Sequence, residues 1–148
     1  MPKLSIIVVV YNLEKYVREC LDSILRQDFK DYEKDYEVIL VDNSSTDSSR
    51  EICREYALRY PQIRFIPLEG KNIPGRAHSV GVAEAKGEYL HLIDGDDFVA
   101  DGCYKDIMKI IDEKAPDMIM GSFICAPEEG AKNMNDAIID ADRINGKT

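Results

Sequence analysis

The sequence predicts an α/β fold: a doubly wound, mainly parallel sheet with helices on both faces. Short apolar runs alternate along the chain with segments of helical periodicity. The first run, Leu4 to Val10, is rich in β-branched residues and almost continuously apolar. Such a run is typical of a parallel strand that is buried on both faces. Parallel strands need right-handed crossover connections, and these place helices on the two faces of the sheet.

The first strand is expected at Leu4–Val10, followed by a helix that Asn12 can cap. The apolar residues of this helix recur at the spacing of one helix face. They are Val17, Cys20, Leu21, Ile24 and Leu25. We therefore expect this helix to pack on the sheet.

A second strand is predicted at 37–41, followed by a polar loop over 42–47 and a helix to about Leu58. Ser48 and Glu51 have the spacing of a capping box at the start of that helix.

The third strand is predicted at 63–68. A loop that contains glycine and proline then leads to a helix of small residues over 76–85, which Gly87 is expected to end.

The last predicted elements are a strand at 89–93, a helix over 104–113 and a fifth strand at 117–123. Residues 1–125 are taken as the sheet-forming portion. Residues 126–148 are polar, and we expect a loop and one short helix there.

Composition fits a single acidic globular domain. The 148 residues are enough to bury a substantial core. The formal net charge is −9 and the basic residues are scattered, which argues against a nucleic-acid partner. An acidic protein can still bind a phosphorylated ligand when a bound cation supplies local positive charge.

Cysteine usage and hydropathy suggest a cytoplasmic chain. The cysteines have no metal-ligand spacing, so we expect them to be reduced and in or near the core. They are Cys20, Cys53, Cys103 and Cys125. The longest apolar run, Ile6 to Val10, is too short to cross a bilayer, so no membrane segment is expected in this chain. An anchor elsewhere on a longer parent chain stays open.

Polar clusters follow three of the predicted strands, at Tyr11-Asn12, Asp42 to Asp47 and Asp94 to Asp97. In open α/β sheets, ligands bind at the carboxyl ends of strands, where strand order reverses. Three carboxylates within the last cluster repel one another unless a cation is present, and Mg²⁺ is held by one or two carboxylates plus phosphate oxygens. A solvated Asp-Gly turn is the other interpretation of this cluster.

The loop after the second strand has two interpretations. Its donors and acceptors could recognise a base edge or a ribose, but Thr46 and Asp47 also suit the cap of the next helix. Of the two histidines, His91 is expected to be a sheet residue, whereas His78 could reach a phosphate.

Several common catalytic motifs are missing from the sequence. There is no glycine-rich dinucleotide or P-loop motif after the first strand, and no Gly-x-Ser-x-Gly elbow. These absences argue against a dehydrogenase, a P-loop NTPase and a serine hydrolase.

The chain resembles the family-2 glycosyltransferases of GT-A fold over about Lys3 to Phe123. The motifs that carry this resemblance occur in order along the sequence. They are Ser5 to Asn12, Val41 to Ser48, Gly81 to Tyr89, and Asp94-Gly95-Asp96-Asp97. The resemblance implies a transferase that moves a sugar, with inversion, from a nucleotide diphosphate sugar to a hydroxyl of a glycan, lipid or other acceptor. It also implies a place in polysaccharide or cell-wall biosynthesis.

By this resemblance, the nucleoside pocket would be lined by Val9, Val10, Tyr11, Asp42 and Asn43. Asp94 and Asp96 would take the place of the family's D-x-D motif. Asp96 would bind Mn²⁺ or Mg²⁺ at the donor diphosphate, and Asp94 would lie nearer the ribose and the donor sugar. The metal would act as a Lewis acid that neutralises the departing diphosphate.

Two positions depart from the family pattern. Asn43 stands where a second Asp often recognises uracil, which leaves the donor base open. The family's Ala-Arg-Asn-x-Gly is replaced by Ala77-His78-Ser79-Val80-Gly81, so an Arg near the diphosphate is lost. Arg76 or His78 could substitute for it.

The resemblance further implies a longer domain whose second half binds the acceptor and supplies the catalytic base. We expect this chain to be a truncated N-terminal portion, with the base beyond Thr148 and little transferase activity of its own. The alternative is a non-catalytic nucleotide-binding or interaction module of the same fold. A nucleotidyltransferase fits less well, because Tyr11-Asn12-Leu13-Glu14 stands where such enzymes have a glycine-rich loop.

Overall fold

The computed structural model describes residues 1–29 and 35–121. These residues belong to two compact units. The first is formed by Met1–Leu25 and Phe29–Phe98, and the second by Arg26–Asp28 with the chain from Val99 onward. The predicted boundary between residues 125 and 126 lies outside the described residues.

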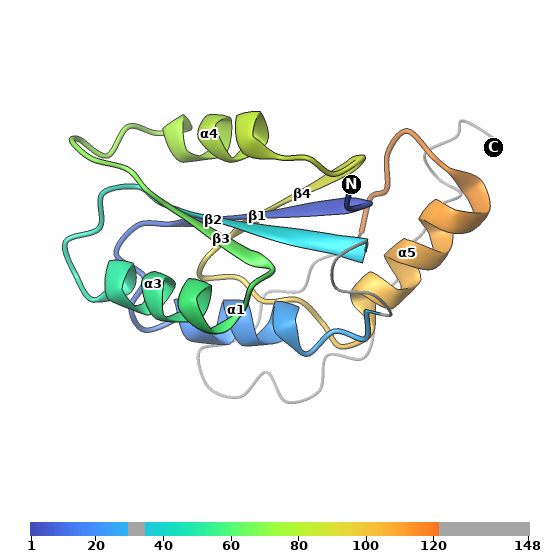
Figure 1. Ribbon diagram of the computed structural model, residues 1–148, viewed down its shortest axis with the longest axis horizontal. Helices are drawn as coiled ribbons and strands as arrows, with labels where there is room; N and C mark the ends of the chain where they lie inside the picture. The colour runs from blue at the N-terminus through green and yellow to red at the C-terminus, as the bar shows by residue number, and fades with distance from the viewer. Residues whose placement is uncertain (30–34, 122–148) are drawn as a thin grey trace. The chain divides into compact units, whose positions relative to one another are not determined.

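The first unit is built on a sheet of parallel strands in the order β3-β2-β1-β4 (Figure 1). The predicted doubly wound α/β fold is confirmed. The strands are β1 (Leu4–Val10), β2 (Tyr36–Asp42), β3 (Ile63–Pro67) and β4 (Tyr89–Asp94).

Strand β1 is the centre of this sheet. It pairs with β2 on one side, from Leu4 opposite Tyr36 to Val10 opposite Asp42. On its other side it pairs with β4, where Val9 lies opposite Asp94. The chain first adds strands on the β2 side and then returns to add β4 on the opposite side, so strand order reverses between β1 and β4.

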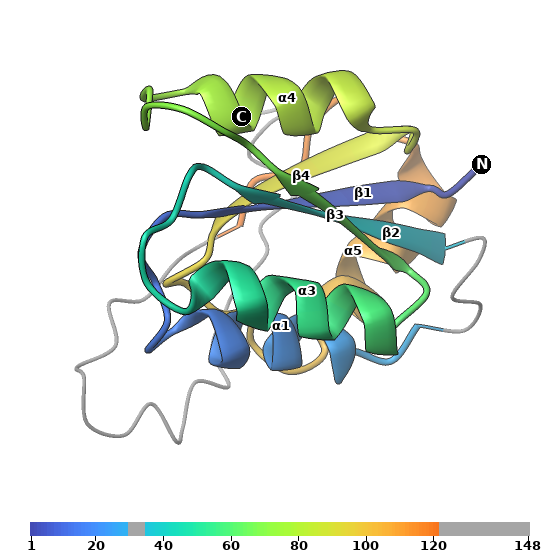
Figure 2. The ribbon, with the colours of Figure 1, turned by 60° about the vertical axis from the view of Figure 1, so that its left-hand side comes forward.

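Helices cover both faces of the sheet. Helices α1 (Val17–Leu25) and α3 (Ser49–Arg59) lie on one face, and α4 (Arg76–Glu84) lies on the other (Figure 2). Because side chains alternate along a strand, each face has its own core. The core under α4 contains Ile7, Ile39, Val41, Leu68 and Ala77.

The described part of the second unit contains helix α5 (Cys103–Lys114) and the residues before it. Gln27 donates from Nε2 to the Ala100 carbonyl at 3.0 Å and accepts at Oε1 from the Tyr104 backbone N–H. Arg26 forms an exposed ion pair with Asp101 at 2.8 Å. In the described part of the chain, no helix has both the length and the apolar character needed to cross a membrane.

Two predicted helix caps are wrong, because the capping groups form hydrogen bonds with residues that are distant in the sequence. Asn12 does not cap α1, which begins only at Val17. Instead, its Oδ1 accepts the Thr46 backbone N–H at 2.8 Å. Ser48 occupies the N-cap position of α3 but makes no side-chain capping bond, and its backbone N–H donates to Glu14 at 3.0 Å.

The predicted fifth strand is also wrong over the described residues. Residues 117–121 are not in a strand, and the rest of the predicted segment lies outside the described residues. Met118 and Met120 are exposed. The alternation of apolar residues predicted a strand, but a strand also needs a neighbour to pair its backbone groups, and this segment pairs with none of the described strands.

Gly87 does not end α4 as predicted, because the helix stops at Glu84 and Ala85 is already extended. The chain instead passes very close to β1 at this glycine. Its N–H donates to Ser5 Oγ at 2.7 Å. A Cβ at this position would lie 2.5 Å from the Ser5 backbone nitrogen.

We expect Gly87→Ala to lower the free energy of unfolding by about 2 kcal/mol, because the added carbon meets backbone that cannot turn aside. Urea unfolding followed by circular dichroism measures this change. Gly121→Ala is the matched control, since a Cβ at Gly121 would have no atom within 4 Å. Equal stability of the two variants would contradict the close approach.

Candidate functional site

The carboxyl ends of β1, β2 and β4 bring the predicted site residues to one edge of the sheet. Val9 is paired with Asp94, and Val10 with Asp42, so the three strands end at the same level. Tyr11 follows β1 and is 41% exposed. The edge includes the point between β1 and β4 where strand order reverses, which is where open α/β sheets bind ligands.

The turn at Asp94-Gly95-Asp96-Asp97 is hydrogen-bonded to the end of β1. The Gly95 N–H donates to the Val9 carbonyl at 2.9 Å, and the Asp97 N–H donates to the Asp94 carbonyl at 2.9 Å. A Cβ at Gly95 would lie 3.0 Å from both Val10 Cγ2 and the Val9 oxygen. The glycine therefore lets the turn lie against the strand.

The carboxylates of this turn converge. Asp94, Asp96 and Asp97 are exposed, and one oxygen from each lies within 4.8 Å of the others. Burial raises the pKa of Asp97, and the neighbouring charges of Asp96 and Asp94 raise it further. Hard oxygen ligands this close together fit a divalent cation such as Mg²⁺ or Mn²⁺.

Two side chains from other elements contact Asp94. His78 of α4 places Nε2 3.5 Å from Asp94 Oδ1. Cys20 of α1 lies beneath the turn, with Sγ 3.8 Å from the Asp94 carbonyl. Burial raises the pKa of the Cys20 thiol to about 12, with the Asp97 charge as a further cause, so the thiol stays protonated and can donate.

Asp42 ends β2 and is fully buried. Its carboxylate accepts from Arg50 Nε at 2.7 Å and from the Ser45 N–H at 3.2 Å. Arg50 also donates to the Leu68 carbonyl at 2.6 Å and to Glu69 at 2.7 Å. One ion pair, between the buried Asp42 and the partly buried Arg50, thus holds together the ends of β2 and β3 and the start of α3.

Asn43, the next residue, is 5% exposed. Its N–H donates to the Val10 carbonyl at 2.8 Å, which joins it to the end of β1. Its side-chain Nδ2 contacts Asn72 and Ile73 in the loop before α4.

The loops after β1 and β2 hold each other through reciprocal hydrogen bonds. Asn12 donates its N–H to Ser45 Oγ at 3.0 Å, and Leu13 donates to Ser49 Oγ at 2.8 Å. Asp47 accepts the Glu14 N–H at 3.1 Å and the Ser49 N–H at 2.9 Å. Asp47 therefore accepts a hydrogen bond from the first turn of α3, as the capping interpretation of the sequence predicted.

Among the described residues, Arg76 makes no hydrogen bond or ion pair with the acidic turn, whereas His78 contacts Asp94. The Arg76 guanidinium donates to the Glu69 carbonyl at 2.7 Å. Of the two residues proposed to replace the lost Arg, His78 is therefore the one that contacts the carboxylate cluster.

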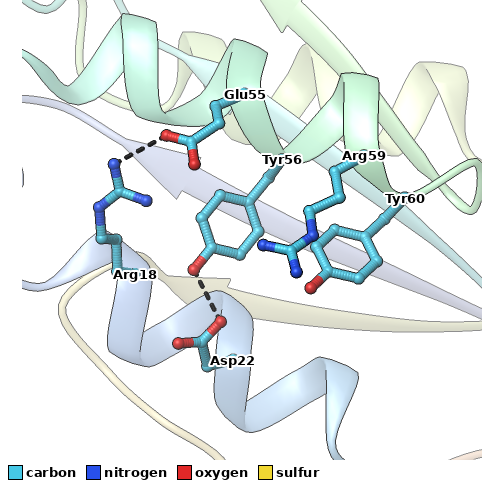
Figure 3. A pocket seen from close by; sticks show the side chains of 6 residues that line it. All are labelled: Arg18, Asp22, Glu55, Tyr56, Arg59 and Tyr60. Atoms are coloured by element: carbon cyan, nitrogen blue, oxygen red, sulfur yellow. Dashed lines mark hydrogen bonds and ion pairs between the residues drawn. The ribbon is translucent and has the colours of Figure 1, made fainter.

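A separate polar pocket lies between α1 and α3 (Figure 3). It is lined by Arg18, Asp22, Glu55, Tyr56, Arg59 and Tyr60. Tyr56 donates to Asp22 at 2.7 Å, and Arg18 pairs with Glu55 at 2.8 Å. These residues therefore bond to one another. They lie toward the C-terminal end of α3, whereas Asp42 lies beside its N-terminal end, so the pocket is not part of the candidate site.

Arg50, Asn72 and Cys20 contact the predicted site residues but were not predicted from the sequence. Arg50 could have been found by asking which cation neutralises an acid at the end of a buried strand, since such acids need a partner. Asn72 and Cys20 carry no such signal, because their partners are far away in the sequence.

Arg50→Ala should lower the free energy of unfolding by about 3 kcal/mol, because it leaves the Asp42 charge buried without its partner. Chemical denaturation measures the loss. Arg54→Ala, on the same helix, should change stability by less than about 0.5 kcal/mol, since Arg54 pairs with Glu51 only at 4.0 Å and both are exposed. Adding Asp42→Asn to Arg50→Ala should recover part of the loss. Equal losses for Arg50→Ala and Arg54→Ala would refute this account of the ion pair.

Two solved structures resemble the described part of the chain in fold. The crystal structure of Staphylococcus aureus TarS 1-349 in complex with UDP-GlcNAc matches with a TM-score of 0.69 and 35% identity, over 76% of this chain and 32% of that one. The mannosyltransferase PcManGT from Pyrobaculum calidifontis, in complex with GDP-Man and Mn²⁺, matches with a TM-score of 0.66 and 26% identity, over 76% and 33%. The predicted GT-A fold is confirmed.

Sequence comparison identifies relatives that are much longer than this chain. Glycosyltransferase GlyG of Streptococcus pneumoniae is 34% identical over 120 residues, which are 81% of this chain and 38% of that protein. The poly(ribitol-phosphate) beta-N-acetylglucosaminyltransferase TarS of Staphylococcus aureus is 36% identical over 121 residues, which are 81% and 21%. The family model described as Glycosyl transferase family 2 matches residues 5–145. The chain therefore belongs to glycosyltransferase family 2.

Proposed function

We propose that this chain is the donor-binding part of a metal-dependent glycosyltransferase. It binds a nucleotide diphosphate sugar at the carboxyl edge of the sheet. The whole protein then transfers the sugar, with inversion, to a hydroxyl of a glycan or lipid acceptor. The observation that carries the proposal is the convergence of Asp94, Asp96 and Asp97 beside the end of β1, where strand order reverses.

The ends of β1 and β2 would bind the nucleoside part of the donor, and the turn after β4 would bind its diphosphate. Tyr11 is exposed next to the buried Asn43 region, which suits the flat face of a nucleobase. Asp42 supports this region from beneath through Arg50 and does not itself face solvent. Val9 forms the backbone link between the nucleoside end and the acidic turn, through its carbonyl.

The acidic turn would receive the diphosphate together with the cation. Asp96 and Asp94 would hold Mn²⁺ or Mg²⁺, and a bound divalent cation neutralises the departing nucleoside diphosphate as a Lewis acid. His78, against Asp94, is placed to orient this carboxylate or to donate to a phosphate oxygen. Without such a cation, the crowded carboxylates would repel a diphosphate.

The solved relatives support a nucleotide sugar as the ligand class. One was crystallised with UDP-GlcNAc and another with GDP-Man and Mn²⁺. The chain spans well under half the length of the curated relatives it matches first. The acceptor site, the base and the transfer itself are therefore assigned to the whole protein.

Binding of UDP and GDP should require Mn²⁺ or Mg²⁺ and should weaken by about tenfold or more in Asp96→Ala, because a metal ligand is lost. Titration calorimetry with and without MnCl₂ measures both effects. Glu88→Gln is the matched control, since this exposed acid precedes β4 at the end opposite Asp94. Metal-independent binding, or an equal effect of the two variants, would rule out the proposed site.

A further inference from the structure

The backbone at Asn12 has an unusual conformation. Its φ is 52°, in the left-handed region that residues other than glycine seldom occupy. Asparagine tolerates this region better than most residues, because its short polar side chain can bond to nearby backbone, whereas alanine meets a steric penalty there. Strained backbone persists only where its surroundings hold it in place. Helix α1 begins at Val17 and is not capped by Asn12, so the helix does not account for this conformation.

The loop after β2 holds the side chain of Asn12. Its Oδ1 accepts the Thr46 N–H at 2.8 Å and the Asp47 N–H at 3.3 Å. A backbone N–H only donates hydrogen bonds, so the atom that faces these two groups is the amide oxygen. In return, the Asn12 N–H donates to Ser45 Oγ at 3.0 Å. The backbone and the side chain of Asn12 are therefore both bonded to the segment 45–47.

These bonds fix the backbone on both sides of Tyr11. On one side is Val10, which pairs with β2 and whose carbonyl accepts the Asn43 N–H at 2.8 Å. On the other side is Asn12. The Tyr11 side chain is 41% exposed and forms no hydrogen bond or ion pair with the residues that the structure describes. The direction of this side chain therefore depends on the backbone that carries it.

We propose that Asn12 is a positioning residue for the nucleoside part of the donor. It holds the loop after β1 against the loop after β2, and so presents the ring of Tyr11 in the direction in which a nucleobase stacks on it. This inference rests on the proposed function, which places the nucleoside beside Tyr11. The acidic turn is held by a different bond, from the Gly95 N–H to the Val9 carbonyl, so Asn12 has no part in binding the diphosphate.

The expected benefit is one of preorganisation. Fixing one flexible side chain at the moment of binding weakens a dissociation constant by about 2- to 10-fold. The bonds of Asn12 fix the backbone that carries Tyr11 before the donor arrives, so the donor does not have to order it. Only a ligand that contacts Tyr11 gains from this order. Pyrophosphate lacks a nucleoside and therefore gains nothing from it.

Titration of the chain with UDP, GDP and pyrophosphate in MgCl₂ tests the proposal. Asn12→Ala should weaken the nucleotide that binds more tightly by about five- to tenfold, and should change the affinity for pyrophosphate by less than about twofold. Asn12→Gly should behave like Asn12→Ala, because glycine accepts the left-handed backbone but lacks the oxygen. Asn12→Asp should keep the wild-type affinity to within about twofold, because its carboxylate still accepts the two N–H groups and aspartate also tolerates this backbone.

A destabilised variant outside the site separates positioning from a general loss of stability. Gly87→Ala serves here, because Gly87 lies against Ser5 near the other end of β1 and an added Cβ would meet backbone. We expect this variant to unfold at lower urea concentration than the wild type. Its affinities for the nucleotide and for pyrophosphate, measured without urea, should equal those of the wild type.

The possible failures can be told apart. If Asn12→Ala weakens nucleotide and pyrophosphate equally, or weakens neither, the positioning role is wrong and the proposed function stands. If Asn12→Asp loses affinity or Asn12→Gly keeps it, the held oxygen is not responsible and the role is again wrong. The same conclusion follows if Gly87→Ala reproduces the loss. If neither nucleotide binds in the presence of Mg²⁺, the proposed function fails, and the inference fails with it.

Discussion

The pairing of β1 with a strand on each side is the constraint on which the rest of the structure depends. The last carbonyls of β1 anchor both loops of the candidate site. Val10 accepts the Asn43 N–H, and Val9 accepts the Gly95 N–H, at 2.8 and 2.9 Å. A shift of β1 by one residue would reverse which face each side chain occupies. It would also break the two hydrogen bonds that hold Asn43 and Gly95 at the end of β1.

The acidic residues at this edge have two different environments. Asp42 is buried and paired with Arg50, so its charge stabilises the ends of β2 and β3. Asp94, Asp96 and Asp97 are exposed and close together, an arrangement that favours a cation over the free carboxylates. The first acid is thus buried with a partner, whereas the others are exposed and crowded together.

Local pattern was enough to predict most of the fold. The strands at Leu4–Val10 and 63–68 were predicted to within a residue, because burial on one or both faces leaves a clear periodicity. The apolar face of the helix after Asn12 was also predicted, although this helix begins later than expected, at Val17. Three of the failures, at Asn12, Ser48 and Gly87, have one cause. Each group was expected to serve its nearest helix, but it bonds to a loop or strand that is distant in the sequence.

The sequence by itself determined the order of strands and helices, the family and the acidic turn, because these depend on residue type and spacing along the chain. Tertiary structure decided which groups face one another: Arg50 against Asp42, His78 against Asp94, and Asn72 against Asn43. The physical reason is that hydrogen bonds and ion pairs act over a few ångströms in space. Their partners here are brought together by the parallel sheet, whose crossovers return each strand end to the same edge.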